Sequence, residues 1–220
     1  MNIKENHIEK GVRYYNVDGE LYPSVTSVLS ATKDTTFLDE WRARVGEEEA
    51  NRISNESARI GNITHEMIEH HLKNNDHLIE NIVEDKEYIE KANKIFQKMK
   101  MFTKYITPEF QEYPLASKNL RVAGRVDCIG TYKGELSIID FKTSRREKVV
   151  EHVHDYFIQT TLYALMAYET LNIQVRQGVI IIGNYDTFPN KYTRPLGMFI
   201  REAVDRVRLF HQLAENGKNA

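Results

Sequence analysis

Two aspartates and a lysine stand close together in two neighbouring apolar segments near the middle of the chain. Asp127 lies within residues 123–130, whereas Asp140 and Lys142 end an apolar run that begins at residue 137. Side chains alternate between the faces of a β-strand, so Asp140 and Lys142 point to the same side. Converging carboxylates are typical ligands for Mg²⁺, and a nearby lysine orients a water or neutralises developing charge. The spacing therefore predicts a divalent-metal site at one edge of a β-hairpin.

The alternative for each aspartate is a salt-bridged or turn-edge carboxylate with a purely structural role. A charge within an apolar strand is costly unless it is paired or bound to a metal, and Ile129, Ile138 and Phe141 are the apolar neighbours in sequence. We therefore favour the metal site for the two aspartates taken together. The backbone carbonyl of Phe141 is well placed to complete its coordination.

Two predicted helices, one on each side of the hairpin, carry further polar candidates. His65 follows Gly61 by one turn, and glycine costs a helix roughly 1 kcal/mol relative to alanine but permits close approach of another backbone. A lone helical histidine is usually a surface or core residue, although imidazole is also a ligand for Mn²⁺. Gln159 and Tyr163 lie four residues apart and share a helix face. They are either surface and core residues, respectively, or groups that hold a phosphate or base.

Hydrophobic periodicity and turn residues predict the elements that position these groups. An Asp18-Gly19 turn joins two short strands within residues 1–22, and Pro23 and Ser24 begin a helix. The order of elements predicts an α/β fold. Further helices are predicted over residues 39–53, 56–71, 85–105, 155–171 and 199–213, strands over 109–115 and 178–183, and a frayed tail over 214–220.

The composition limits the class of protein. The chain has 220 residues, 41% of them hydrophobic, and a net charge of −2, which is compatible with a nucleic-acid partner if the basic residues gather locally. Cys128 is the only cysteine, so neither a disulfide framework nor a cysteine-ligated cluster is expected. No signal peptide, transit peptide or membrane span of ~20 apolar residues is evident, which leads us to expect a cytoplasmic protein.

Together the motifs resemble the PD-(D/E)xK nuclease superfamily, and specifically its RecB-type exonuclease branch with mitochondrial and phage members. Ile139 replaces the proline of the family name, and the cysteines of cluster-bearing relatives are absent, so no iron–sulfur cluster is expected. The resemblance rests on residues 124–127 and 139–143, the Gly61–His65 helix, Gln159 with Tyr163, and residues 23–29 and 38–41.

The resemblance implies a fold and a chemistry. The expected fold is a central mixed β-sheet flanked by helices, a restriction-endonuclease-like core over residues 108–185. It would lie in one domain of residues 1–220, with residues 1–107 roofing the site and 186–220 forming a C-terminal helix and tail. Phosphodiester hydrolysis with Mg²⁺ or Mn²⁺ would use His65, Asp127, Asp140 and the Phe141 carbonyl as ligands. Lys142 would position the attacking water, and Glu112 would contact the metal through a water.

The resemblance also implies a substrate, namely DNA, preferably single-stranded with free ends, in replication, recombination or repair. A structure-selective endonuclease and a catalytically silent DNA-binding module remain alternatives. We expect a monomer in a bacterial or phage-infected cell, with replication or recombination proteins as partners. Expected DNA contacts are Gln159, Tyr163, Arg59, Arg125, Arg145 and Trp41, with Tyr22, Lys118, Arg121, Arg146 and Lys148 as further candidates; for each cation the alternative is a solvated surface charge.

Overall fold

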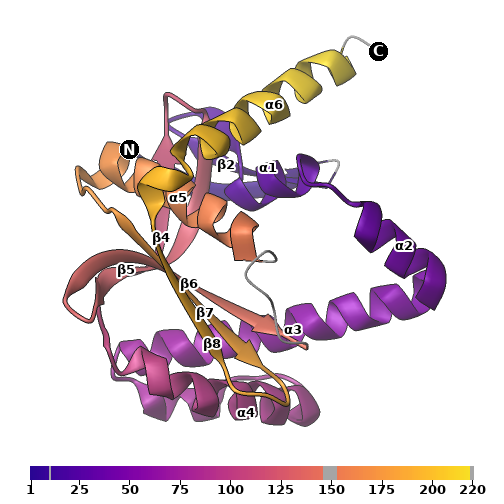
Figure 1. The fold of residues 1–220 in the computed structure, drawn as a ribbon, viewed down its shortest axis with the longest axis vertical. Coiled ribbons are helices and arrows are strands. Elements are labelled where there is room, and N and C mark those ends of the chain that lie inside the picture. The colour runs from indigo at the N-terminus through magenta and orange to yellow at the C-terminus, as the bar shows by residue number, and fades with distance from the viewer. Residues whose placement is uncertain (10, 146–152, 219–220) are drawn as a thin grey trace.

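The computed structural model describes residues 1–9, 11–145 and 153–218, and its main feature is a five-stranded mixed sheet (Figure 1). The strand order is β4-β5-β6-β7-β8, in which β6 and β7 run parallel and the other neighbours are antiparallel. This arrangement confirms the predicted α/β fold with a mixed sheet flanked by helices. The strands are β4 (Ile106–Ser117), β5 (Val122–Tyr132), β6 (Glu135–Ser144), β7 (Gln177–Asn184) and β8 (Asn190–Pro195).

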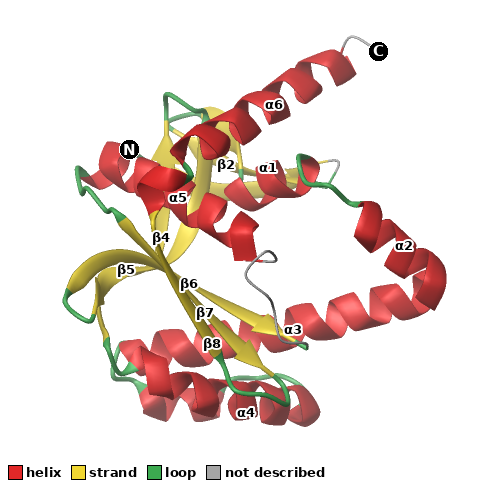
Figure 2. Cartoon of the chain, in the orientation of Figure 1, coloured by secondary structure: helices red, strands yellow, loops and turns green. Residues whose placement is uncertain are grey.

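Helices cover both faces of this sheet (Figure 2). Along β6, Ile138 belongs to one apolar cluster, whereas Ile139 and Phe141 belong to another. Strand alternation therefore gives the sheet two separate cores. The first core packs against α1 (Val25–Ala31), α5 (His154–Leu171) and α6 (Ile200–Lys218), and the second against α3 (Glu47–Leu72) and α4 (Lys86–Thr103).

The strands β5 and β6 separate part-way along their length. Their pairing begins at Tyr132 and Glu135 and ends at the pair Cys128–Ile139. Beyond that pair β5 stays with β4, whereas β6 continues beside β7 as far as Ser144. We call this divergence the fork, and it lies directly beside Asp127 and Asp140.

An N-terminal antiparallel sheet packs against the part of β4 and β5 that contains Ala116 and Ala123. It consists of β1 (Ile3–Glu9), β2 (Val12–Val17) and β3 (Glu20–Pro23). Tyr15, Val17 and Tyr22 are buried in a third cluster together with Ala116 and Ala123. A parallel bridge between Ser24 and Ala123 then places the start of α1 against β5. The N-terminal sheet and α1 are thereby positioned beside the fork.

The structure corrects the predicted helix over 39–53. Gly46 has a φ of +87° and separates α2 (Thr36–Val45) from α3 (Glu47–Leu72), so the second and third predicted helices are divided at a different place. Glycine adopts this left-handed backbone conformation without steric cost, which explains the break. The terminal helix also continues to Lys218 rather than fraying from residue 214. The strands β1 and β8 were not predicted.

Candidate active site

A cleft of about 760 Å³ opens at the fork. One wall is the middle of α3, which contributes Gly61 and His65. Other walls come from β2, the start of α1, β5, β6 and α5. The cleft therefore joins the two faces of the sheet at the point where the sheet opens. It is lined by Asp127, Lys142, Glu112, Arg125, Gln159 and Tyr163, as well as by Arg13, Tyr15, Thr26, Asn62 and Thr143.

Asp140 is almost completely buried and is held by two donors on one oxygen. Lys142 Nζ donates to Asp140 Oδ1 over 2.6 Å, and Gln159 Nε2 donates to the same oxygen over 3.1 Å. The other oxygen, Oδ2, is buried and has no hydrogen-bond partner among the described residues. A buried carboxylate oxygen without a partner is costly, so this atom calls for a cation that the described residues do not supply.

Asp127 lies across the fork from Asp140 and connects to α3. Its Oδ2 accepts a hydrogen bond from the backbone N–H of Phe141 over 2.9 Å and lies 3.6 Å from His65 Nδ1. The His65 ring also meets the ring of Phe141 edge-on, with centroids 6.4 Å apart. The imidazole that the helix supplies is thus adjacent to a carboxylate that the sheet supplies.

Glu112 lies in β4 next to Asp127, with a backbone conformation unusual for a strand. Its φ is +47°, in the left-handed region that non-glycine residues rarely adopt. The pairs on either side, Gln111–Cys128 and Tyr113–Val126, are formed normally. Ligand atoms of Glu112, His65 and Asp127 all lie within 4.8 Å of one another. Backbone strain of this kind is typical of functional sites, and here it accompanies a side chain at the cleft.

The charge of Asp127 opposes the ionisation of Glu112 and Asp140. Burial, reinforced by the charge of Asp127, raises the pKa of Glu112 to about 7. Burial also raises the pKa of Asp140, although the ammonium of Lys142 opposes this effect. For Lys142, burial lowers the pKa, but the carboxylates of Asp140 and Asp127 outweigh it and hold the pKa above its ordinary value. Negative charge is therefore concentrated at the fork, where Lys142 opposes it at Asp140, and Arg125 and Lys73 oppose it at Glu112.

The donor set fits a divalent cation. Carboxylate oxygens are the ligands that Mg²⁺ and Mn²⁺ prefer, and imidazole is compatible with Mn²⁺. The partnerless Oδ2 of Asp140 is an acceptor that such an ion would satisfy. The Phe141 N–H points toward Asp127, and since one residue of a strand presents its N–H and C=O to the same side, the Phe141 carbonyl faces the fork as well.

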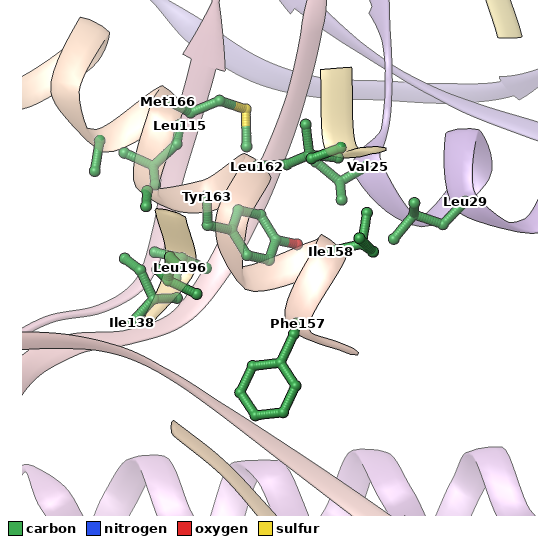
Figure 3. Close-up of a cluster of buried hydrophobic side chains, with 14 of the residues drawn as sticks. Val25, Leu29, Leu115, Ile138, Phe157, Ile158, Leu162, Tyr163, Met166 and Leu196 are labelled. Atoms are coloured by element: carbon green, nitrogen blue, oxygen red, sulfur yellow. The ribbon is translucent and has the colours of Figure 1, made fainter. Parts of the chain in front are cut away.

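The helix α5 fixes the other side of Asp140. Tyr163 is buried against Gly124 of β5, where an added Cβ would lie only 3.0 Å from the tyrosine ring. Figure 3 shows Tyr163 within the apolar cluster that also contains Ile158 and Leu162. Burial raises the pKa of Tyr163 well above its ordinary value. This packing holds the helix in place and thereby directs Gln159 onto Asp140.

Gly61 lies where α3 passes the end of β6, and its neighbour there is the side chain of Thr143 rather than the backbone that the sequence predicted. A Cβ at this position would lie 3.3 Å from Thr143 Oγ1. The helix therefore passes the end of β6 at a distance that leaves little room for a side chain, and His65 follows one turn later.

Comparison with known proteins places the chain in a family. A model of the PD-(D/E)XK nuclease superfamily matches residues 29–215, which is most of the sequence. The chain belongs to this superfamily. The match spans the elements from α3 to α5, whereas β2 and the start of α1, which also line the cleft, precede it.

Two relatives are named Mitochondrial genome maintenance exonuclease 1. The Mus musculus protein is 26% identical over 182 residues and the Homo sapiens protein 28% identical over 180 residues. Each alignment covers 76% of this chain but only 51% and 50% of the respective relative, so the chain spans about half the length of the curated relatives it matches. A solved structure from Eubacterium rectale, provisionally described as an exonuclease, has a TM-score of 0.50 at 13% identity, covering 73% of this chain and 68% of its own, and shows the fold alone.

Several residues expected at the site lie elsewhere in this PD-(D/E)XK chain. Arg59 pairs with Glu84 and Asp85 on the side of α3 away from the cleft lining, and Arg145 pairs with Glu56 over 2.7 Å. Trp41 belongs to α2 and does not line the cleft. Among the expected arginines that the structure describes, Arg125 alone lines it.

The further candidates also differ from expectation. Tyr22 is buried in the N-terminal cluster and is unavailable for stacking on a base. Lys118 pairs with Asp18 over 2.8 Å, and Arg121 lies over the ring of Tyr22. Arg146 and Lys148 lie outside the described residues.

Some residues of the cleft were not predicted from the sequence. Arg13 and Tyr15 reach it from β2, and Asn62 and Thr143 line it near Gly61. Asn62 and Thr143 lie within the segments 61–65 and 139–143 on which the resemblance rests, but neither was singled out. For Arg13 and Tyr15 there was no signal, because β2 is distant in sequence from the fork.

Proposed function

We propose that this chain is an exonuclease that hydrolyses phosphodiester bonds of DNA with Mg²⁺ or Mn²⁺ and prefers single strands with free ends. The observation that carries the proposal is the meeting of His65 and Asp127 at 3.6 Å, beside a buried Asp140 with one partnerless oxygen. Membership of the nuclease superfamily supports the reaction, and the names of the two relatives support the exonuclease assignment.

The proposed ligands of the ion are His65, Asp127, Asp140 and the Phe141 carbonyl. Glu112 joins them directly or through a water, because its ligand atoms lie within 4.8 Å of those of His65 and Asp127. When bound, a divalent cation neutralises charge on the scissile phosphate and promotes ionisation of the attacking water.

The side chains around the proposed ion have distinct tasks. Lys142 orients the attacking water and stabilises the negative charge that develops on the phosphate. Asp140 holds Lys142 through Oδ1, and Gln159 holds Asp140 through the same atom. Gln159 therefore acts on the geometry of the carboxylate in addition to any DNA contact. Arg125, together with Arg13, provides positive charge for the DNA backbone in the cleft.

The walls that several elements give the cleft support a preference for single strands. Its lining comes from α3, from the start of α1 and from β2, in addition to the sheet. A flexible strand adapts to walls on several sides more readily than a stiff duplex does. We propose that α3 takes the roofing role expected of residues 1–107, and that the nuclease works as one domain.

The test is digestion of labelled oligonucleotides. Linear and circular single strands of the same sequence are incubated with the protein and Mg²⁺, Mn²⁺ or EDTA. We expect the linear strand alone to be degraded, and only when a metal is present. Cleavage of the circle would favour the structure-selective endonuclease. Binding without cleavage in either metal would favour the silent DNA-binding module.

The setting of the reaction is also a proposal. We propose a monomer that acts in DNA replication, recombination or repair, in the cytoplasm of a bacterial or phage-infected cell. The word mitochondrial belongs to the names of the relatives. Across the residues that the structure describes, no helix is both long and apolar enough to cross a membrane.

A further inference from the structure

A third residue of α5 lies on the face that carries Gln159 and Tyr163. Tyr156 precedes Gln159 by three residues and Tyr163 by seven, a spacing that places all three on one side of a helix. Gln159 donates to Asp140, and the ring of Tyr156 lies under Lys142, with Nζ 5.2 Å from the ring centroid. One helix face therefore contacts both members of the Asp140–Lys142 pair.

The lysine has two contacts of different character. Lys142 Nζ donates to Asp140 Oδ1 over 2.6 Å, and the face of the Tyr156 ring meets the same ammonium. A cation within about 6 Å of an aromatic centroid is attracted by the negative face of the ring, and the attraction grows as water is excluded. The Lys142 side chain is only 22% exposed, so this contact is largely shielded from solvent.

Tyr156 acts on Lys142 without facing the cleft. Lys142 is part of the cleft lining, whereas Tyr156 is not among the described residues that line it. A direct contact between Tyr156 and a substrate in the cleft is therefore not what the geometry supports. The lysine side chain has four rotatable bonds, and a contact with Asp140 alone leaves it free to follow that carboxylate.

We propose that Tyr156 is a positioning residue. The face of its ring holds the Lys142 ammonium in the position from which it acts on the attacking water and the phosphate. The inference rests on the proposed function for its effect on catalysis, but the contact itself is a property of the chain. The attraction comes from the face of the ring and does not require the hydroxyl.

The first measurement reports the contact without any reaction. In metal-free protein carrying ¹³C at the lysine ε carbons, the ring current of Tyr156 shifts the ε-methylene protons of Lys142 upfield. The signal is assigned with Lys142→Arg. We expect the upfield shift to persist in Tyr156→Phe and to vanish in Tyr156→Leu. An unshifted Lys142 signal in the unsubstituted protein would overturn the proposal.

The second measurement reports the catalytic effect. On a linear single strand with Mn²⁺, Tyr156→Leu should lower kcat about three- to tenfold with little change in KM, whereas Tyr156→Phe should retain kcat. Phenylalanines with increasing numbers of ring fluorines at position 156 should lower kcat stepwise, since fluorine weakens the negative ring face without changing the packing much. A purely structural role would not follow this series.

The control is a tyrosine with similar contacts away from the cleft. Tyr105 lies under Lys104 and Lys133 at 5.0 and 4.8 Å and is 44% exposed. Tyr105→Leu should leave kcat and KM unchanged. Equal losses in Tyr156→Phe and Tyr156→Leu, or a loss confined to KM, would contradict the positioning role. An upfield Lys142 signal in a protein that cleaves nothing would refute the proposed function and leave the contact intact.

Discussion

Asp140 uses its two oxygens for different purposes. Oδ1 accepts hydrogen bonds from Lys142 and Gln159, whereas Oδ2 is buried without a partner among the described residues. Two donors on one oxygen fix the rotation of the carboxylate and leave the other oxygen available as an acceptor. A single residue thereby links the lysine to the ligand set.

Replacing Asp140 should separate binding from catalysis. We expect Asp140→Ala to abolish hydrolysis while DNA affinity stays within a few-fold, because the cations that hold the backbone lie elsewhere in the cleft. Anisotropy of a labelled oligonucleotide measures affinity, and gel analysis measures cleavage. Asp205→Ala, at an exposed ion pair of α6, is the matched control. Residual cleavage well above background would mean that the site is misplaced.

Lys142 offers a complementary test. Lys142→Ala should lower kcat about 10²- to 10³-fold, the range typical for loss of one group that stabilises transition-state charge. Mn²⁺ affinity should change little, because Lys142 contacts Oδ1 and not the oxygen available to an ion. Calorimetric titration with Mn²⁺ checks this expectation. A collapse of metal affinity in the variant would show that Lys142 serves the ligand set instead of the reaction.

At the scale of elements, the sheet and α4 meet at a glycine. A Cβ on Gly183 of β7 would lie 2.3 Å from Ile95 Cγ2 and 2.6 Å from Met99 Sδ. Gly183→Ala should therefore destabilise the protein by about 1–3 kcal/mol through overpacking. Urea unfolding measures the change. Gly197→Ala meets no atom within 4 Å and is the control, and equal midpoints for the two variants would contradict the expectation.

The sequence predicted those elements whose apolar residues recur with a regular period. The hairpin around Asp18-Gly19 and the helix of Gln159 and Tyr163 were predicted, because turn residues and buried stripes are local signals. The edge strand β8 was not, since its sequence NKYTRP has no apolar alternation. Gly46 was not recognised as a break, because only its tertiary setting distinguishes a helix end from a tolerated glycine.

The site was predictable to a similar extent. Residue types and spacing indicated Asp127, Asp140 and Lys142, because a charge within an apolar strand is costly unless it is paired or bound to a metal. The positions of the arginine side chains were not predictable, because surface arginines form ion pairs with residues that are remote in sequence, as Arg59 does with Glu84. Nothing in the sequence around Glu112 indicates its left-handed backbone, because the segment has the pattern of an ordinary strand.

For the whole molecule, burial of Glu112 predicts how stability depends on pH. Its pKa rises from 4.5 to about 7 on folding, so between these values the folded state holds more protons than the unfolded one and stability falls as pH rises. In EDTA, Glu112→Gln should match the unsubstituted protein below pH 4.5 and become progressively more stable than it up to about pH 7, with a constant difference above. Thermal unfolding across this range tests the sign, and parallel curves would contradict it.

The fork predicts how a bound ion would affect the motion of the helices on the two faces of the sheet. Asp140 and Lys142 share the face of the sheet covered by α5, whereas His65 comes from α3 on the opposite face. An ion bound by both would connect two helical layers whose buried apolar residues form separate clusters in the described part of the chain. Hydrogen–deuterium exchange should then slow in α3 and α5 together when Mn²⁺ is added, and slowing confined to one of them would show that the ion is held from a single side.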